Sequence, residues 1–163
     1  MEWEFLQRIM LKIGLPKQWV NLAMEMVRTA SYLTLINGEA KGFITPSRGI
    51  KQGDPLSPYL FLLCAEGLSS LIRRAMENQQ LRGVLSCNGG VKLSHLLFKD
   101  DNLLFCETTT AECRNLIDIL ESYERASGQA INRQKTTLYF SPNTSQRVKL
   151  DIQNMLGPQI MTN

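Results

Sequence analysis

The sequence predicts an α+β fold, an antiparallel sheet with helices packed on one face. Two kinds of pattern support this class. Tight hairpins join apolar runs at 32–44 and 96–105, and helical apolar stripes lie before, between and after them. With 163 residues, the chain is long enough for a substantial core. We therefore expect one domain over residues 1–163.

Two helices open the chain. The first carries a stripe that ends at Gly14, formed by Trp3, Leu6, Ile9, Met10 and Ile13. The second begins near Pro16, and its predicted inner face consists of Trp19, Ala23, Met26 and Val27. Aromatic and methionine side chains at this spacing are typical of a core and need no ligand.

A hairpin and a long helix follow. Asn37-Gly38 is a favoured hairpin turn, so strands are expected at 32–36 and 41–44. Ser57 is a candidate N-cap for the helix, with Pro58 at its first position. The predicted buried face of that helix comprises Phe61, Cys64, Leu68, Leu71, Ile72 and Ala75.

The C-terminal half has mixed structure. A turn-rich stretch surrounds residues 87–90. An amphipathic helix containing Leu116, Ile117, Leu120 and Tyr123 closes near Gly128. A strand over 136–140 and a weak helix over about 144–156 are expected to complete the chain.

Composition excludes little. Lys and Arg total 18 against 15 Asp and Glu, and the net charge of +3 is too small to imply nucleic-acid binding by itself. No apolar run is long enough to span a membrane. The four cysteines lack zinc spacing, and Cys64 and Cys106 resemble small buried apolar residues. This usage suits a reducing intracellular compartment, whether nuclear, cytoplasmic or organellar.

The most informative feature is the polar tetrapeptide Lys99-Asp100-Asp101-Asn102. It joins two short apolar runs with the composition of buried strands, 96–98 and 103–105, and predicts a tight hairpin. Two adjacent carboxylates repel unless a positive charge lies between them, and Mg²⁺ prefers such oxygen ligands. The alternative is ordinary turn chemistry, which taken alone is the commoner explanation of Asp-Asp.

A second motif, at 48–58, places two glycines directly before the long helix. Backbone amides and Gln52 at such a helix start can contact a nucleotide, its sugar or a phosphate. Glycine-rich helix starts are frequent, so the spacing alone indicates phosphate binding only weakly. Asp54 precedes a proline and is interpreted as a helix-start residue. His95 is interpreted as a packed, hydrogen-bonded histidine.

The literal strings are more specific than their spacing. RGIKQGDPLSPYLFLL, HLLFKDDNLLF and SGQAINRQK, in this order, resemble reverse transcriptases of non-LTR (LINE-type) retrotransposons, particularly plant-like ones. The likeness extends from about residue 2 to about residue 140. It implies a partial polymerase palm that lacks the fingers and the first palm strand, with 141–163 beginning the following region.

The resemblance also implies roles for individual residues. Asp100, Asp101 and Lys135 would be catalytic. The two aspartates would hold Mg²⁺ (or Mn²⁺), and Lys135 would lie near the triphosphate and protonate or neutralise pyrophosphate; taken without the resemblance, Lys135 is interpreted as a surface lysine. The residues implied to contact template, primer or nucleotide are Arg48, Gly49, Lys51, Gln52 and Gly53. The implied partners are an RNA template, a DNA primer and a dNTP, with no membrane.

Two departures from the family pattern limit these expectations. The first catalytic aspartate of the family would fall two positions before Met1, so a protein partner would have to complete the palm. Lys99 stands where the family carries a small or apolar residue, and its charge opposes cation binding. The favoured interpretation is that Lys99 neutralises the carboxylate pair in a chain that no longer binds metal. The alternatives are a non-catalytic nucleic-acid or protein-binding module and a retroelement remnant without function.

Overall fold

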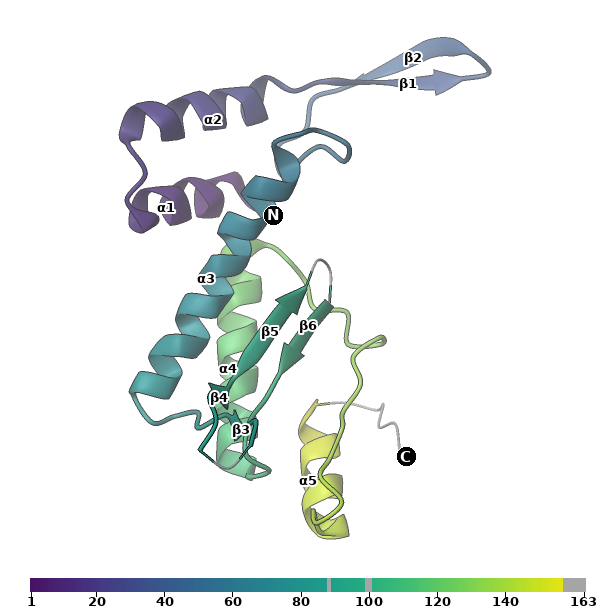
Figure 1. Cartoon of the computed structure of the whole chain (residues 1–163). Helices are drawn as coiled ribbons and strands as arrows, with labels where there is room; N and C mark the ends of the chain where they lie inside the picture. Colours follow the sequence, from purple (N-terminus) through teal and green to yellow (C-terminus); the bar gives the residue numbers. More distant parts are fainter. Residues whose placement is uncertain (88, 99–100, 157–163) are drawn as a thin grey trace. The chain divides into compact units, whose positions relative to one another are not determined.

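The computed structural model describes residues 1–87, 89–98 and 101–156. Its elements follow one another along the chain as labelled in Figure 1. They form two compact units: unit 1 contains Met1–Glu66 and Ala126–Gln129, and unit 2 contains Gly67–Arg125 and the chain from Ala130 onward. No described helix combines the length and apolar character needed to cross a bilayer.

Unit 1 is built around two amphipathic helices and the start of a third. These are α1 (Trp3–Ile13), α2 (Lys17–Thr29) and the N-terminal half of α3 (Ser57–Glu77). Gly14, at φ 97°, ends α1 as predicted, because glycine adopts this left-handed conformation without a Cβ clash. The buried core of the unit consists of Leu6, Met10, Val20, Ala23, Met24, Leu60 and Cys64.

The predicted inner face of α2 is partly wrong. Trp19 and Met26 are 44% and 51% exposed, whereas Val20 and Met24 are buried beside Ala23. Two stripes, one residue apart, both satisfy helical spacing in this segment, and packing against α1 selects the more aliphatic one.

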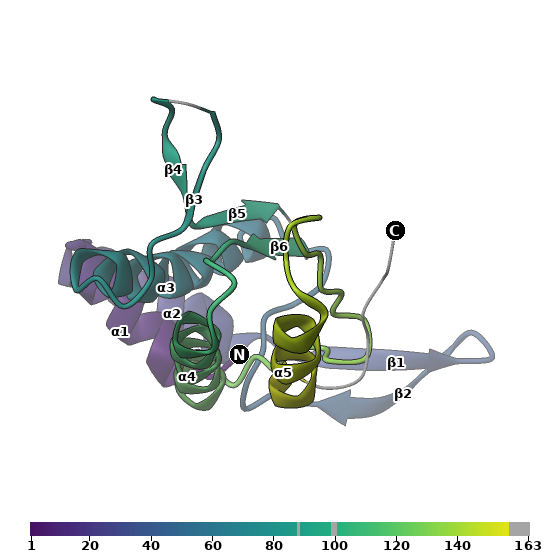
Figure 2. The ribbon, with the colours of Figure 1, turned by 90° about the horizontal axis from the view of Figure 1, so that it is seen from below.

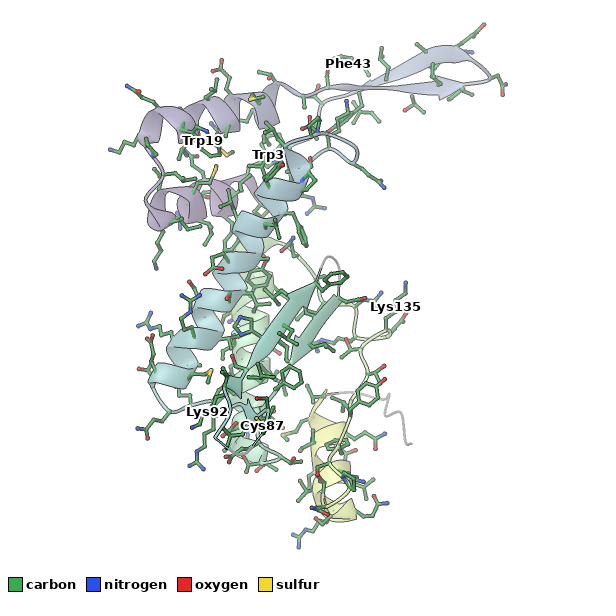
Figure 3. All side chains as sticks on the ribbon, viewed as in Figure 1. Trp3, Trp19, Phe43, Cys87, Lys92 and Lys135 are labelled. Carbon is green, nitrogen blue, oxygen red and sulfur yellow. The ribbon has the colours of Figure 1, made fainter. Side chains whose placement is uncertain are left out.

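The first predicted hairpin is confirmed. Strands β1 (Tyr32–Ile36) and β2 (Glu39–Ile44) pair antiparallel around Asn37 and Gly38, both of which have positive φ. The register shifts between Leu33 and Thr34. Apolar side chains of this hairpin remain exposed, including Phe43, which is labelled in Figure 3.

Unit 2 holds the C-terminal half of α3, two further hairpins and two helices. The hairpins are β3 (Val84–Leu85) with β4 (Lys92–Leu93), and β5 (His95–Phe98) with β6 (Asp101–Leu104). The helices are α4 (Thr110–Ser127), which ends in unit 1, and α5 (Gln146–Leu156). Figure 2 shows the β3–β4 hairpin standing away from the helices of this unit.

The predicted α+β class is confirmed, and all described strand pairs are antiparallel. They form three separate two-stranded sheets within the described residues. α4 lies on one side of the β5–β6 hairpin in both ribbon views (Figure 1 and Figure 2). The predicted strand at 136–140 is wrong. Within this segment only Leu138 is paired, as an isolated bridge, and a strand needs several consecutive paired residues.

Candidate active site

The loop before α3 is anchored at its first glycine. The N–H of Gly49 donates to the carbonyl oxygen of Met1 at 2.8 Å, and its own carbonyl accepts from Trp3 Nε1 at 2.6 Å. Gly49 has φ 82°, a conformation that disfavours any residue with a Cβ. The start of the loop is therefore fixed by residues far away in the sequence.

The other end of the loop is tied to the helix start. Ser57 Oγ donates to the carbonyl oxygen of Lys51 at 2.5 Å, and the N–H of Leu56 donates to Asp54 Oδ1 at 2.8 Å. Asp54 therefore occupies the predicted helix-start role. The N-cap prediction for Ser57 is wrong, because Ser57 is the first residue of α3 and its hydroxyl bonds back to the loop.

Between these anchors, and at Arg48 just before them, the loop is open to solvent. Arg48, Lys51, Gln52 and Gly53 are all exposed. Arg48 Nη1 lies 3.9 Å from Glu2 Oε1, a long ion pair between exposed groups that holds Arg48 only weakly. Lys51 Nζ lies 5.8 Å from the centroid of the Tyr32 ring, within cation–π range.

The cavity beneath this loop is small. Its volume is about 30 Å³, and its walls include Tyr32, Lys51 and Asp54. That is room for about one water molecule, whereas a small-molecule pocket needs roughly 300 Å³ or more. This cavity is therefore too small to enclose a nucleotide.

The segment at 127–128 also contacts the N-terminal residues that hold the loop, within unit 1. The N–H of Glu2 donates to the carbonyl oxygen of Ser127 at 2.7 Å. A Cβ added to Gly128 would lie 2.8 Å from Glu2 Oε1 and 2.9 Å from its Cγ. Residues 1–3, Gly49 and 127–128 thus meet, although they come from three separate parts of the sequence.

The β5–β6 hairpin is confirmed in unit 2, and the connection between its strands is shorter than predicted. Phe98 pairs with Asp101 and Leu97 with Asn102, so Asp101 and Asn102 belong to the strand. The prediction that residues 99–102 all form the turn is therefore wrong for Asp101 and Asn102. Lys99 and Asp100 lie outside the described residues.

The two faces of this hairpin differ. Asp101 shares a face with Phe98, Leu96 and Leu103, which are 76%, 48% and 55% exposed, so the prediction of buried strands is wrong for this face. On the other face, His95 Nε2 lies 2.8 Å from Ser69 Oγ and Nδ1 lies 2.9 Å from Ser94 Oγ. The predicted hydrogen-bonded histidine is confirmed.

The donor chemistry of the hairpin suits a hard cation. Asp101 is exposed and supplies carboxylate oxygens, the ligand type that Mg²⁺ and Mn²⁺ prefer. Within the described part of the chain, no group of three or more His, Cys, Asp or Glu side chains is placed to hold a metal. Among the described residues, Asp101 is therefore not part of a group that could hold a metal ion.

Lys135 lies in a turn of unit 2 whose backbone is well anchored. Asn132 Oδ1 accepts from the N–H groups of Gln134 and Lys135, each at 3.2 Å. Arg133 Nη2 lies 3.7 Å from carboxylates of both Glu121 and Glu124 on α4. The Lys135 side chain itself is exposed (Figure 3).

The structure thus gathers the loop residues Arg48, Gly49, Lys51, Gln52 and Gly53 in unit 1 and places Asp101 and Lys135 in unit 2. No hydrogen bond or ion pair joins Asp101 to Lys135 among residues 1–87, 89–98 and 101–156. Sequence reasoning missed the supporting roles of Trp3 and Tyr32. Neither contact leaves a periodic signal, since Trp3 and Gly49 are 46 positions apart.

The comparison with protein families identifies the class of protein to which this chain belongs. The family profile described as "Reverse transcriptase (RNA-dependent DNA polymerase)" matches residues 1–157, and the chain belongs to this family. The match spans nearly the whole chain and confirms the family predicted from the three motifs.

Individual relatives refine the placement. An uncharacterized mitochondrial protein of Arabidopsis thaliana is 56% identical over 69 residues, which cover 42% of this chain and 57% of that protein. The Pol polyprotein of the type-1 retrotransposable element R2 from Nasonia vitripennis is 30% identical over 133 residues, 82% of this chain and 12% of the polyprotein. The R2 polyprotein from Popillia japonica is 29% identical over 128 residues, 78% of this chain and 20% of the polyprotein.

The R2 relatives agree with the predicted non-LTR lineage, and the Arabidopsis match agrees with a plant-like member. The chain spans between about an eighth and somewhat over half of the length of these relatives. It is therefore a reverse transcriptase segment. A family of this kind acts on nucleic acid and generally uses divalent metal ions.

Proposed function

We propose that this chain is the palm segment of an RNA-directed DNA polymerase that extends a DNA primer on an RNA template. The observation that carries the proposal is the β5–β6 hairpin, which begins its second strand with the exposed Asp101. In the reaction, the primer 3′-oxygen attacks the α-phosphorus of a dNTP, a P–O bond forms, and pyrophosphate leaves.

Asp100 and Asp101 are the residues assigned to metal binding. These carboxylates would hold Mg²⁺ or Mn²⁺, which would supply positive charge to activate the attacking hydroxyl and to neutralise the leaving pyrophosphate. Asp101 is suited to this role because strand pairing with Phe98 fixes its backbone while its carboxylate stays open to solvent. A pair of metals needs a further, separated carboxylate, and the described residues place none beside Asp101, so we expect residues 1–163 not to polymerise by themselves.

The loop at 48–53 is assigned to template–primer and nucleotide contact. Arg48 and Lys51 carry exposed positive charges that suit phosphate groups, and Gln52 and Gly53 lie in the turn that the Ser57–Lys51 hydrogen bond closes. Anchoring at Gly49 and at Lys51 limits the conformational entropy that binding must remove. Lys135 is assigned to the pyrophosphate because its charge is exposed on a fixed turn.

The test begins with metal binding. Mn²⁺ titrated into the chain should give a calorimetric signal that Asp100→Asn/Asp101→Asn removes. Asp151→Asn, an exposed aspartate on α5, is the control for loss of negative charge alone. Equal titrations of the unaltered chain and the Asp100/Asp101 variant would overturn the assignment.

Primer extension on a primed RNA template with Mg²⁺ or Mn²⁺ completes the test. The expected result is no extension by the 163-residue chain. Extension that disappears in Asp100→Asn/Asp101→Asn would mean that catalysis needs no further carboxylate. The need for a protein partner that completes the palm would then be contradicted.

A non-catalytic nucleic-acid-binding module is the second candidate, favoured by the exposed Arg48 and Lys51 on an anchored loop. Binding through phosphates weakens steeply with salt, because neutralised phosphates release counterions. Salt-dependent binding of primed template that is the same with Mg²⁺ and with EDTA would favour this module over the polymerase segment.

A further inference from the structure

Two cysteines of unit 2 lie side by side. Cys106 follows β6, and Cys113 lies in the first turn of α4. Their Sγ atoms are 4.0 Å apart, within hydrogen-bonding distance for sulfur, and both thiols are free. Cys113 is buried and Cys106 is half-buried. This arrangement is independent of the proposed polymerase site.

The segment between the two cysteines is held by one carboxylate. Glu112 Oε2 accepts from the N–H of Glu107 at 3.0 Å and from the N–H of Arg82 at 3.2 Å. The N–H of Glu112 donates to Thr109 Oγ1 at 3.2 Å. The turn therefore returns the chain on itself and keeps the two sulfurs as neighbours.

The pair is also chemically asymmetric. The hydrogen bond from Cys106 lowers the pKa of Cys113, and the same bond, together with burial, raises the pKa of Cys106. The N-terminal turn of α4 adds a favourable dipole for a thiolate at Cys113. One sulfur is thus the better nucleophile, and a second thiol stands ready to react with it.

We propose that Cys106 and Cys113 are a redox modification site, at which hydrogen peroxide converts the two thiols into a reversible disulfide bond. The Cys113 thiolate attacks a peroxide oxygen, an S–O bond forms, the O–O bond breaks, and water leaves after protonation. Cys106 Sγ then attacks Cys113 Sγ, an S–S bond forms, and the S–O bond breaks. Its hydroxide departs as a second water with the Cys106 proton. Two thiols are oxidised and one peroxide is reduced to two waters.

The other cysteines lack this arrangement. Cys64 is buried in unit 1 beside Met1 Sδ, and burial raises its pKa to about 12. Cys87 is exposed on the β3–β4 hairpin (Figure 3). A disulfide at 106–113 would link Cys106, two residues after β6, to the first turn of α4.

Peptide mapping tests the proposal directly, because trypsin cuts after Lys99 and Arg114 and so releases both cysteines in one peptide, 100–114. The intact chain carrying Cys87→Ser is treated with hydrogen peroxide, unfolded, and alkylated with iodoacetamide. We expect this peptide to lack alkyl groups and to weigh two hydrogens less than the reduced peptide. Dithiothreitol should restore two alkylatable thiols.

Two controls keep the outcome decisive. Cys106→Ser, compared by far-UV circular dichroism for folding, should abolish the lighter peptide. The unaltered sequence should form it more slowly in urea than in buffer, because folding is what holds the sulfurs together. Two alkylated cysteines after peroxide, sulfinic acids without an S–S bond, or equal rates in urea and buffer would each overturn the proposal.

Discussion

The indole Nε1 of Trp3 donates a hydrogen bond to the carbonyl oxygen of Gly49 at 2.6 Å. Through it, the first helix fixes the start of the loop that carries Arg48 and Lys51. Trp3 is half-buried, so its N–H would lose its partner without gaining full access to water.

Trp3→Phe removes this N–H while keeping an aromatic side chain. We expect the free energy of unfolding to fall by about 1–2 kcal/mol, from the lost hydrogen bond and the carbonyl left without its partner. Urea denaturation measures it. Trp19→Phe is the matched control, because Trp19 is exposed on α2 and should change stability by less than about 0.5 kcal/mol. Equal effects of the two substitutions would show that the Trp3 contact does not hold the loop.

Gly128→Ala tests the meeting of Glu2 with the end of α4. Gly128 has φ 67°, and an added Cβ would approach Glu2 Cγ to 2.9 Å. We expect a loss of about 1–3 kcal/mol, from the positive φ and from the close contact together. Glu2→Ala removes the contact without changing the backbone strain at Gly128, and it also removes the long ion pair with Arg48.

A double-mutant cycle separates the two causes. If the contact matters, Gly128→Ala should be less destabilising in the Glu2→Ala background than in the unaltered chain. Strictly additive losses of stability would leave backbone strain as the whole explanation.

Local features were predictable where a few neighbouring residues decide them. Gly14 ends α1 and Asn37-Gly38 turns the first hairpin as expected. The buried face of α2 was not predictable, because two stripes one residue apart fit the same helical period. The exposure of Leu96 and Leu103 was not predictable either. It depends on which elements pack against the hairpin, and the composition of the strands does not specify that.

The candidate site likewise has local features that the sequence predicts and long-range contacts that it does not. The motifs identified the loop at 48–53 and the Asp-Asp hairpin, because each is a short continuous string. The contacts of Trp3 with Gly49 and of Lys51 with Tyr32 join distant residues and depend on the fold. Long-range pairs of this kind carry no signal in one sequence.

Tyr32 is expected to position Lys51 for phosphate contact. Tyr32→Leu should weaken binding of a primed template about two- to fivefold, the equivalent of an exposed cation–π interaction. Tyr32→Phe keeps the ring and should bind as the unaltered chain does. Lys51→Gln should reduce the magnitude of the slope of log K against log salt by about one, the contribution of a single phosphate contact. Fluorescence anisotropy over a salt series measures all three, and identical binding by the Leu and Phe variants would remove Tyr32 from this role.

Lys99→Ala should tighten Mg²⁺ binding at the Asp-Asp hairpin. A lysine adjacent to Asp100 in sequence adds a positive charge beside the proposed cation ligands, which lowers the affinity of a second cation. Calorimetric titration compares the variant with the unaltered chain. Lys92→Ala, an exposed lysine on the neighbouring hairpin, is the control for net charge. Unchanged Mg²⁺ affinity in Lys99→Ala would contradict the expectation.

Glu112 is expected to stabilise unit 2 more than any exposed carboxylate on its helices. Its side chain is only 9% exposed, and it accepts hydrogen bonds from the backbone N–H groups of Arg82 and Glu107. Glu112→Ala leaves both donors without that partner and should lower the free energy of unfolding by about 2–4 kcal/mol. Glu112→Gln keeps an acceptor oxygen and should lose less. Glu77→Ala, at the exposed end of α3, should cost under about 0.5 kcal/mol. Urea denaturation of the three variants measures these differences, and a Glu112→Ala loss no larger than that of Glu77→Ala would show that the buried carboxylate does not hold the turn.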